Sequence, residues 1–219
     1  MERRQQMKIE LENVKPMDIE ARSFEIITEE LKDTPLIPGT ELIVKRCIHT
    51  SADFDYAENL CFSEDAVEKA IAAIKEGACI VTDTQMAKAG INKKALARYG
   101  GEVFCFMSDE DVARIAKENG STRATASMDK AAGLSKKLIF AIGNAPTALV
   151  RLYELIEEGG LKPELIIGVP VGFVNVVQSK ALIMKTDVPY IVARGRKGGS
   201  NIAACICNAL LYMIDNNRE

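Results

Sequence analysis

From residue 79 onwards, short apolar runs recur along the chain, with longer stretches of mixed polarity between them. None of these runs alternates cleanly between apolar and polar positions, as a strand with one solvated face does. Continuous apolar strands are typical of a parallel sheet that is covered on both faces. The pattern therefore predicts about five buried strands, at residues 79–82, 103–106, 138–142, 165–169 and 190–193.

Helical periodicity precedes and separates these runs. Ile43, Val44, Cys47 and Ile48 recur at helical spacing after a Pro-Gly-Thr turn, although residues 42–44 alone would also suit a strand. Capping residues, Pro146 and terminal glycines delimit three further helices, at residues 66–76, 146–158 and 200–214.

Strands that alternate with helices predict the fold class and the domain organisation. The expected fold is α/β, with an open, mostly parallel sheet of about five strands and helices on both faces. No linker or internal repeat divides the chain, so we assign residues 7–219 to one domain. Residues 1–6 are predicted to be a disordered extension, with Met7 as an alternative start.

The last predicted helix, residues 200–214, is apolar on nearly all sides. A helix of this kind must be buried all round, and one sheet covers only one side of it. Neighbouring helices of the same chain are one possible cover for the other side. We expect a partner subunit to be the cover, and therefore a homodimer.

The segments that leave the strand ends are rich in small and special residues. In open α/β sheets, ligands bind beyond the carboxyl ends of the strands. The composition of any one of these loops is explained by the needs of a tight turn. Four such loops on one edge of the sheet favour an anionic ligand, because the last of them also carries Arg194, Arg196 and Lys197. The four loops begin at Thr82, Gly143, Gly168 and Arg194. No dinucleotide-binding glycine fingerprint follows an early strand, so a nucleotide cofactor is weakly supported.

His49 is the only histidine of the chain, and it lies in the polar cluster 46–53. Histidine is the usual proton carrier at neutral pH, because its unperturbed pKa lies in that range. On a helix, Arg46, His49 and Asp53 would share one face opposite the apolar stripe. The alternative is an imidazole that only packs at a helix end, on a face that is merely solvated.

Composition narrows the class of protein. The net charge is −3 and aromatic residues make up 5% of the chain, which argues against nucleic-acid binding. The six cysteines form no Cys-x-x-Cys pair, and one histidine cannot complete a two-histidine metal site, so no metal is expected. We predict reduced, mostly buried thiols and a cytoplasmic protein, with no membrane span and no secretory signal.

Four motifs together resemble the precorrin-8X methylmutase family, also called cobalt-precorrin-8 methylmutase. They are Arg46-Cys47-Ile48-His49-Thr50-Ser51 and the segments 143–149, 168–174 and 194–200. The motifs are long and stand in the family's order, and the likeness runs from Arg22-Ser23-Phe24 to the last helix. It implies an isomerase of cobalamin biosynthesis that moves a methyl group from ring carbon 11 to ring carbon 12 of precorrin-8X or cobalt-precorrin-8. The product is hydrogenobyrinate or cobyrinate.

The resemblance also implies roles for individual residues. His49 is expected to donate or accept the proton, and Ser23, Arg46, Thr122 and Arg123 are expected to bind the tetrapyrrole. It implies a homodimer with active sites near the subunit interface, and a shift of this kind needs no cofactor.

Two other functions stay open at the level of sequence. One is a non-catalytic corrinoid-binding or carrier protein, in which His49 would only donate a hydrogen bond. The other is an unrelated nucleotide-binding α/β enzyme. The Arg46-x-x-His49 pair favours the isomerase over the carrier, because a pure binder needs no titrating group.

Overall fold

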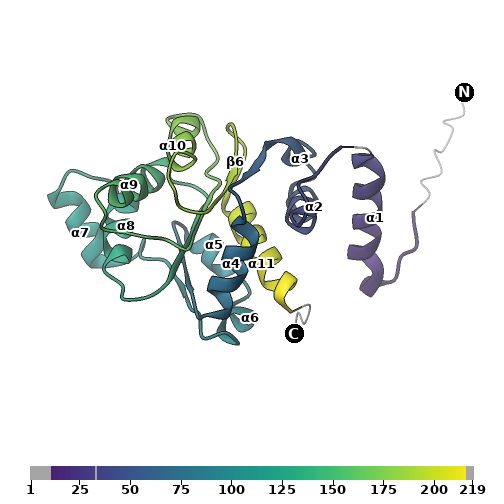
Figure 1. Ribbon diagram of the computed structural model, residues 1–219, viewed down its shortest axis with the longest axis horizontal. Helices are drawn as coiled ribbons and strands as arrows, with labels where there is room; N and C mark the ends of the chain where they lie inside the picture. Colours follow the sequence, from purple (N-terminus) through teal and green to yellow (C-terminus); the bar gives the residue numbers. More distant parts are fainter. Residues whose placement is uncertain (1–10, 33, 216–219) are drawn as a thin grey trace, which may run out of the picture.

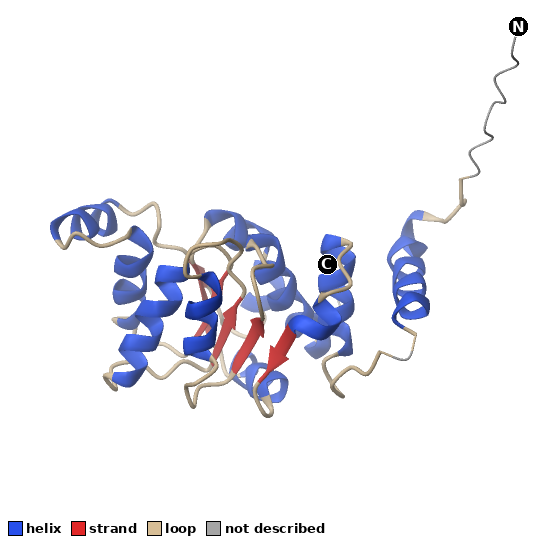
Figure 2. Ribbon diagram, turned by 90° about the horizontal axis from the view of Figure 1, so that it is seen from above, coloured by secondary structure: helices blue, strands red, loops and turns tan. Residues whose placement is uncertain are grey.

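The predicted apolar runs form neighbouring strands of one sheet. The structure is a computed structural model that describes residues 11–32 and 34–215. Within these residues the sheet has six strands in the order β1-β6-β5-β4-β2-β3, and it lies between helices (Figures 1 and 2). The strands are β1 (Leu60–Phe62), β2 (Cys79–Thr82), β3 (Val103–Phe104), β4 (Leu138–Ile142), β5 (Leu165–Gly168) and β6 (Tyr190–Ala193).

All neighbouring strands run parallel except β1, which pairs antiparallel with β6 at one edge. The predicted fold class is confirmed, with one strand more than expected. Sequence analysis missed β1 because it has only three residues and follows a four-residue helix directly.

The sheet separates two apolar cores, which explains why its strands show no polar face. In β4, Leu138, Phe140 and Ile142 pack into one core, whereas Ile139 and Ala141 pack into the other. The first core is closed by α8 (Arg123–Ala132), α9 (Pro146–Glu157) and α10 (Val176–Ile183). The second is closed by α2 (Glu41–Ser51), α4 (Ala66–Lys75), α5 (Gln85–Gly90), α6 (Lys93–Ala97) and α11 (Ser200–Ile214).

The helices predicted at residues 66–76, 146–158 and 200–214 are present as α4, α9 and α11, and the stretch around residues 43–48 is helical rather than extended. The remaining elements are η1 (Pro16–Asp18), α1 (Ile19–Leu31), α3 (Tyr56–Asn59) and α7 (Glu110–Glu118). The predicted disordered residues 1–6 and the alternative start Met7 lie outside the described residues.

Helix α11 is covered by its own chain. Its residues from Ile202 to Leu211 are buried, apart from the half-buried Asn208, between the sheet and the helices α2, α4 and α5. The expectation that a partner subunit covers this helix is therefore wrong, and the alternative of neighbouring helices holds. The apolar faces of α2, α4 and α5 cover α11 within the same chain.

Helix α1 stands at the margin of the molecule, and both views show it beside α2 and away from the sheet (Figures 1 and 2). Ile27 and Leu31 are its buried residues, whereas Ile19 and Ile26 on other sides are exposed. Helix α1 therefore forms one wall next to α2 and leaves much of its own surface open.

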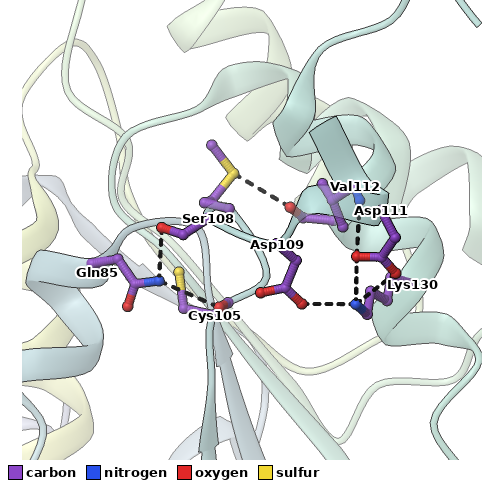
Figure 3. A network of polar contacts seen from close by, with 9 residues as sticks. Gln85, Cys105, Ser108, Asp109, Asp111, Val112 and Lys130 are labelled. Carbon is purple, nitrogen blue, oxygen red and sulfur yellow. Dashed lines mark hydrogen bonds and ion pairs between the residues drawn. The ribbon is translucent and has the colours of Figure 1, made fainter. Parts of the chain in front are cut away.

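Helix α7 lies at the opposite end of the molecule from α1 (Figure 1), and a polar network holds it there (Figure 3). Lys130 on α8 donates to Asp109 and Asp111, at the start of α7, over 2.7 Å each. Hydrogen bonds to these two carboxylates raise the pKa of Lys130. Gln85 donates to Ser108 Oγ at 3.2 Å and so connects α5 to the same turn. The network stabilises the loop after β3.

Candidate active site

The four glycine-rich and polar loops meet at one edge of the sheet, as predicted. Strands β2, β4, β5 and β6 lie side by side and parallel, so their carboxyl ends share that edge. Helices α9, α10 and α11 begin there, and Thr84 Oγ1 lies 2.8 Å from Ser200 Oγ across it. This edge is where a ligand binds in open α/β sheets.

A buried carboxylate holds the loop after β4. Asp83 accepts hydrogen bonds from the backbone N–H groups of Gly143, Asn144 and Ala145 at 2.9, 2.8 and 2.6 Å. Burial raises the pKa of Asp83, and the three N–H donors oppose that shift. The carboxylate thereby sets the entry of the chain into α9.

The loops after β5 and β6 are held to each other by their backbones. Gly199 N donates to Val169 O at 2.9 Å, and Gly172 N donates to Arg196 O at 3.1 Å. A Cβ atom at Gly198 would lie 2.1 Å from Val169 O, so this close approach requires glycine.

The outer rim of these loops combines apolar and cationic groups. Val171, Phe173 and Val174 are 50%, 80% and 79% exposed. The guanidinium of Arg196 lies 5.4 Å from the centre of the Phe173 ring. The rim therefore offers contacts to both an apolar surface and an anion.

Lys197 connects the loop after β6 to the end of α2. Its Nζ lies 2.7 Å from Asp53 Oδ2 and 2.5 Å from Asp55 Oδ2. The hydrogen bond from Lys197 lowers the pKa of Asp53, and the two carboxylates raise that of Lys197. The loop that the sequence marks as basic therefore neutralises two acids rather than offering all its charge to a ligand.

His49 occupies the last turn of α2 and is exposed. Its ring lies 5.7 Å from that of Phe24 on α1, with the ring planes at 85°. The imidazole borders a recess of about 210 Å³ between α1 and α2. The recess is lined by Ser23, Ile26, Ile27, Glu30, Ile48, His49, Ala52 and Phe54.

Arg46 faces a different cavity. Its Nη1 lies 2.6 Å from Glu20 Oε1, its guanidinium carbon lies 4.8 Å from the centre of the Tyr212 ring, and its buried Nε has no hydrogen-bond partner. Arg46 borders a cavity of about 290 Å³ that is also lined by Thr50 and Cys205. The Thr50 hydroxyl donates to Cys205 Sγ at 3.2 Å.

The expectation that Arg46, His49 and Asp53 share one helical face is therefore wrong. Ala52 adopts a left-handed conformation, with φ at 54°, and ends α2 after Ser51. Asp53 consequently leaves the helix and pairs with Lys197. Arg46 is turned towards α1 and α11 by Glu20 and Tyr212.

The predicted site residues fall into two groups on opposite faces of the sheet. Ser23 borders the His49 recess and donates its hydroxyl hydrogen to Ile19 O at 2.8 Å. Thr122 and Arg123 lie instead at the start of α8, both exposed, where Thr122 Oγ1 accepts from Thr125 N at 3.1 Å. Thr122 also lies 2.9 Å from Thr147 Oγ1 at the start of α9, which places this second group beside the loop after β4.

Sequence analysis missed one buried cation behind this edge. Lys180 of α10 is 1% exposed, and its Nζ donates to the carbonyl oxygens of Gly195 and Lys197. The available signal was a lysine within a largely apolar helical stretch, residues 176–183.

The described residues offer neither a metal site nor a membrane span. No group of three or more His, Cys, Asp or Glu side chains among the described residues is placed to hold a metal ion. No helix in the part of the chain that the structure describes is both long and apolar enough to span a bilayer.

Comparison with known proteins identifies the family. The model of the precorrin-8X methylmutase family matches residues 18–213. The cobalt-precorrin-8 methylmutase of Priestia megaterium is 46% identical over 203 residues, which are 93% of this chain and 90% of that protein. The enzyme of the same name from Salmonella typhimurium is also 46% identical, over 90% of this chain and 95% of that protein. The solved structure of the precorrin-8X methyl mutase from Thermus thermophilus superposes with a TM-score of 0.82 at 38% identity, over 91% of this chain and 98% of that chain. The chain belongs to the precorrin-8X methylmutase family.

Proposed function

We propose that this protein moves a methyl group from ring carbon 11 to ring carbon 12 of precorrin-8X or cobalt-precorrin-8, with His49 as the proton carrier. The product is hydrogenobyrinate or cobyrinate. The observation that carries the assignment of His49 is its place: the only histidine of a methylmutase-family chain is exposed at a helix end and borders a recess with Ser23.

The reaction is an isomerisation, so atoms and electrons balance without a co-substrate. One carbon–carbon bond to the methyl group breaks at carbon 11 and one forms at carbon 12. A proton supplied to the conjugated ring before migration weakens the bond to the methyl group, and the same proton is returned afterwards. General acid–base catalysis by a positioned side chain typically contributes about 10² to 10⁴-fold. Holding the macrocycle in a reactive shape supplies the remainder.

The other site residues are assigned to binding. Arg123 is exposed at the start of α8, where its guanidinium and the helix N-terminus both favour a peripheral carboxylate of the substrate. Thr122 caps that helix and so positions Arg123. We propose that Ser23 contacts the substrate in the recess that His49 borders. Arg46 binds a carboxylate of the substrate, either in place of Glu20 or together with it.

We also propose a homodimer, on grounds other than the burial of α11. The His49 recess holds about 210 Å³, whereas sites for drug-sized ligands usually enclose about 300 to 1,000 Å³. The apolar rim at Val171, Phe173 and Val174 is exposed in the single chain. A second copy seated on that rim would cover its apolar side chains.

A cytoplasmic location fits the thiol chemistry. All six cysteines are free, and five of them are buried. Unpaired thiols in this number suit a reducing compartment.

The test is to incubate the protein with purified precorrin-8X or cobalt-precorrin-8 and to monitor conversion by the visible spectrum. Migration makes carbon 11 trigonal and extends the conjugation, so the spectrum changes while the molecular mass does not. Tight binding of the substrate without any spectral conversion would identify a corrinoid carrier instead.

A further inference from the structure

Lys180 is a buried cation whose described hydrogen bonds go to main-chain carbonyls. Its Nζ lies 2.8 Å from Gly195 O and 2.9 Å from Lys197 O, and the residue is 1% exposed. Burying a charge is costly unless hydrogen bonds compensate it. A lysine at this position therefore secures two carbonyls of the loop after β6 from inside the protein.

The two carbonyls flank Arg196, so Lys180 fixes the centre of the loop of residues 194–199. Each cation of that loop has a separate partner. Arg194 Nη2 lies 3.1 Å from Cys61 Sγ, and Arg196 lies over the Phe173 ring. Lys197 reaches out to the acids that follow α2. The backbone that Lys180 holds therefore determines where three side chains are presented.

The contact with Lys197 continues into the helix end that carries His49. Asp55 N donates to Asp53 Oδ1 at 3.1 Å, and Asp53 N donates to Ser51 Oγ at 3.3 Å. Ser51 Oγ in turn donates to Cys47 O at 2.7 Å within α2. These bonds form a continuous path from the loop after β6 to the last turn of α2.

We propose that Lys180 is a positioning residue that fixes the loop 194–199 and, through Lys197 and its two aspartates, the end of α2 that carries His49. The inference rests on the proposed function only in the role given to His49. A buried lysine that merely stabilises the fold would affect the unfolding temperature without changing the surroundings of His49.

The histidine provides a direct readout, because a chain with one histidine gives a single set of imidazole resonances in NMR, called the His49 signal below. We would compare the wild type with Lys180→Met, which keeps the apolar stem and removes the donors. The matched control is Lys185→Met, an exposed lysine just after the same helix. We expect Lys180→Met to move the His49 signal and to lower kcat about 10 to 10²-fold, while the control does neither. A folded Lys180→Met protein with the wild-type His49 signal would overturn the proposal.

The double variant with Lys197→Met tests the path itself. If Lys180 acts through Lys197, the two substitutions are not additive, and the double variant shows the His49 signal of Lys197→Met alone. Additive displacements would show that Lys180 acts on His49 by another path and would also overturn the proposal.

Two further results keep the test decisive. If Lys180→Met does not fold, Lys197→Met decides alone: Lys197 is exposed and its replacement should fold, and an unchanged His49 signal would refute the path. If the wild type converts no substrate, the proposed function fails, but the NMR comparison still judges the positioning role.

Discussion

Phe24 of α1 and His49 of α2 meet edge to face, with their ring centres 5.7 Å apart and their planes at 85°. Such pairs contribute about 0.5 to 1.5 kcal/mol beyond the burial of their area. The contact restrains the imidazole from the side of α1. Helix α1, which stands away from the sheet, is thus a wall of the candidate site.

Replacing Phe24 with leucine keeps an apolar side chain and removes the ring contact. We expect kcat to fall about 2 to 10-fold, the factor that corresponds to the loss of one such aromatic pair, and the unfolding temperature to fall by about 1 to 6 °C. Steady-state conversion of the substrate measures the first and calorimetry the second. Ile19→Ala, an exposed position on the same helix, serves as the control and should leave both unchanged. Equal kcat values in Phe24→Leu and the wild type would exclude a role for the ring.

Arginine to lysine substitutions should separate the two predicted carboxylate contacts. Arg123 is exposed at a helix start, so Arg123→Lys should weaken substrate binding about 10-fold, since lysine does not reproduce the fork geometry, and leave stability unchanged. Arg46 is half-buried against Glu20 and Tyr212, so Arg46→Lys should lower both affinity and the free energy of unfolding. Titration calorimetry and urea unfolding give the two quantities. Arg114→Lys on α7, an exposed arginine paired with Glu118, is the matched control. Wild-type affinity in both variants would place the carboxylate contacts elsewhere.

The sheet was predictable from sequence because its strands carry apolar residues on both faces. Two details were not. The strand expected at residues 103–106 ends at Phe104, which pairs with Val81 and whose carbonyl oxygen accepts a hydrogen bond from the Thr82 side chain. The edge strand β1 depends on antiparallel pairing with β6, which lies about 130 residues further along the chain.

Burial lowers the pKa of Lys180 to about 8, from an ordinary value of 10.5. Between these two values the unfolded chain binds more protons at this residue than the folded protein does. The free energy of unfolding therefore rises with pH across this window, and the cost of the buried charge is fully present below pH 8. Urea unfolding of the wild type and Lys180→Met at pH 7.5 and 9.5 isolates this contribution. The wild type should gain stability relative to the variant at the higher pH, and a relative loss would contradict the assignment.

The homodimer makes a prediction about the exposed rim after β5. Light scattering should give about twice the chain mass of 23.9 kDa for the wild type. Phe173→Ser together with Val174→Ser should shift the protein towards a monomer, because both side chains are about four-fifths exposed in the single chain. Ile37→Ser, an exposed apolar residue elsewhere, should leave the mass unchanged. A wild-type monomer that converts substrate would refute the dimer.

The candidate site was predictable in its residues more than in its geometry. His49 was identified because it is the only histidine, and the four loops because parallel strands bring their ends together. The position of Asp53 could not be predicted, because the left-handed Ala52, directly before it in the chain, ends α2. Neither could the carbonyl partners of Lys180, since they depend on how α10 packs beside β6.

The most direct measurement is the visible spectrum of substrate incubated with the wild type and with His49→Ala. His49 is exposed at the end of α2, so its replacement should leave the fold and the binding of the product intact. We predict that the wild type converts precorrin-8X or cobalt-precorrin-8 to the corrin product. We predict a loss of about 10² to 10⁴-fold in the rate for His49→Ala, as expected when a general acid–base group is removed. Conversion by His49→Ala at a rate near that of the wild type would contradict the role of His49 as the proton carrier.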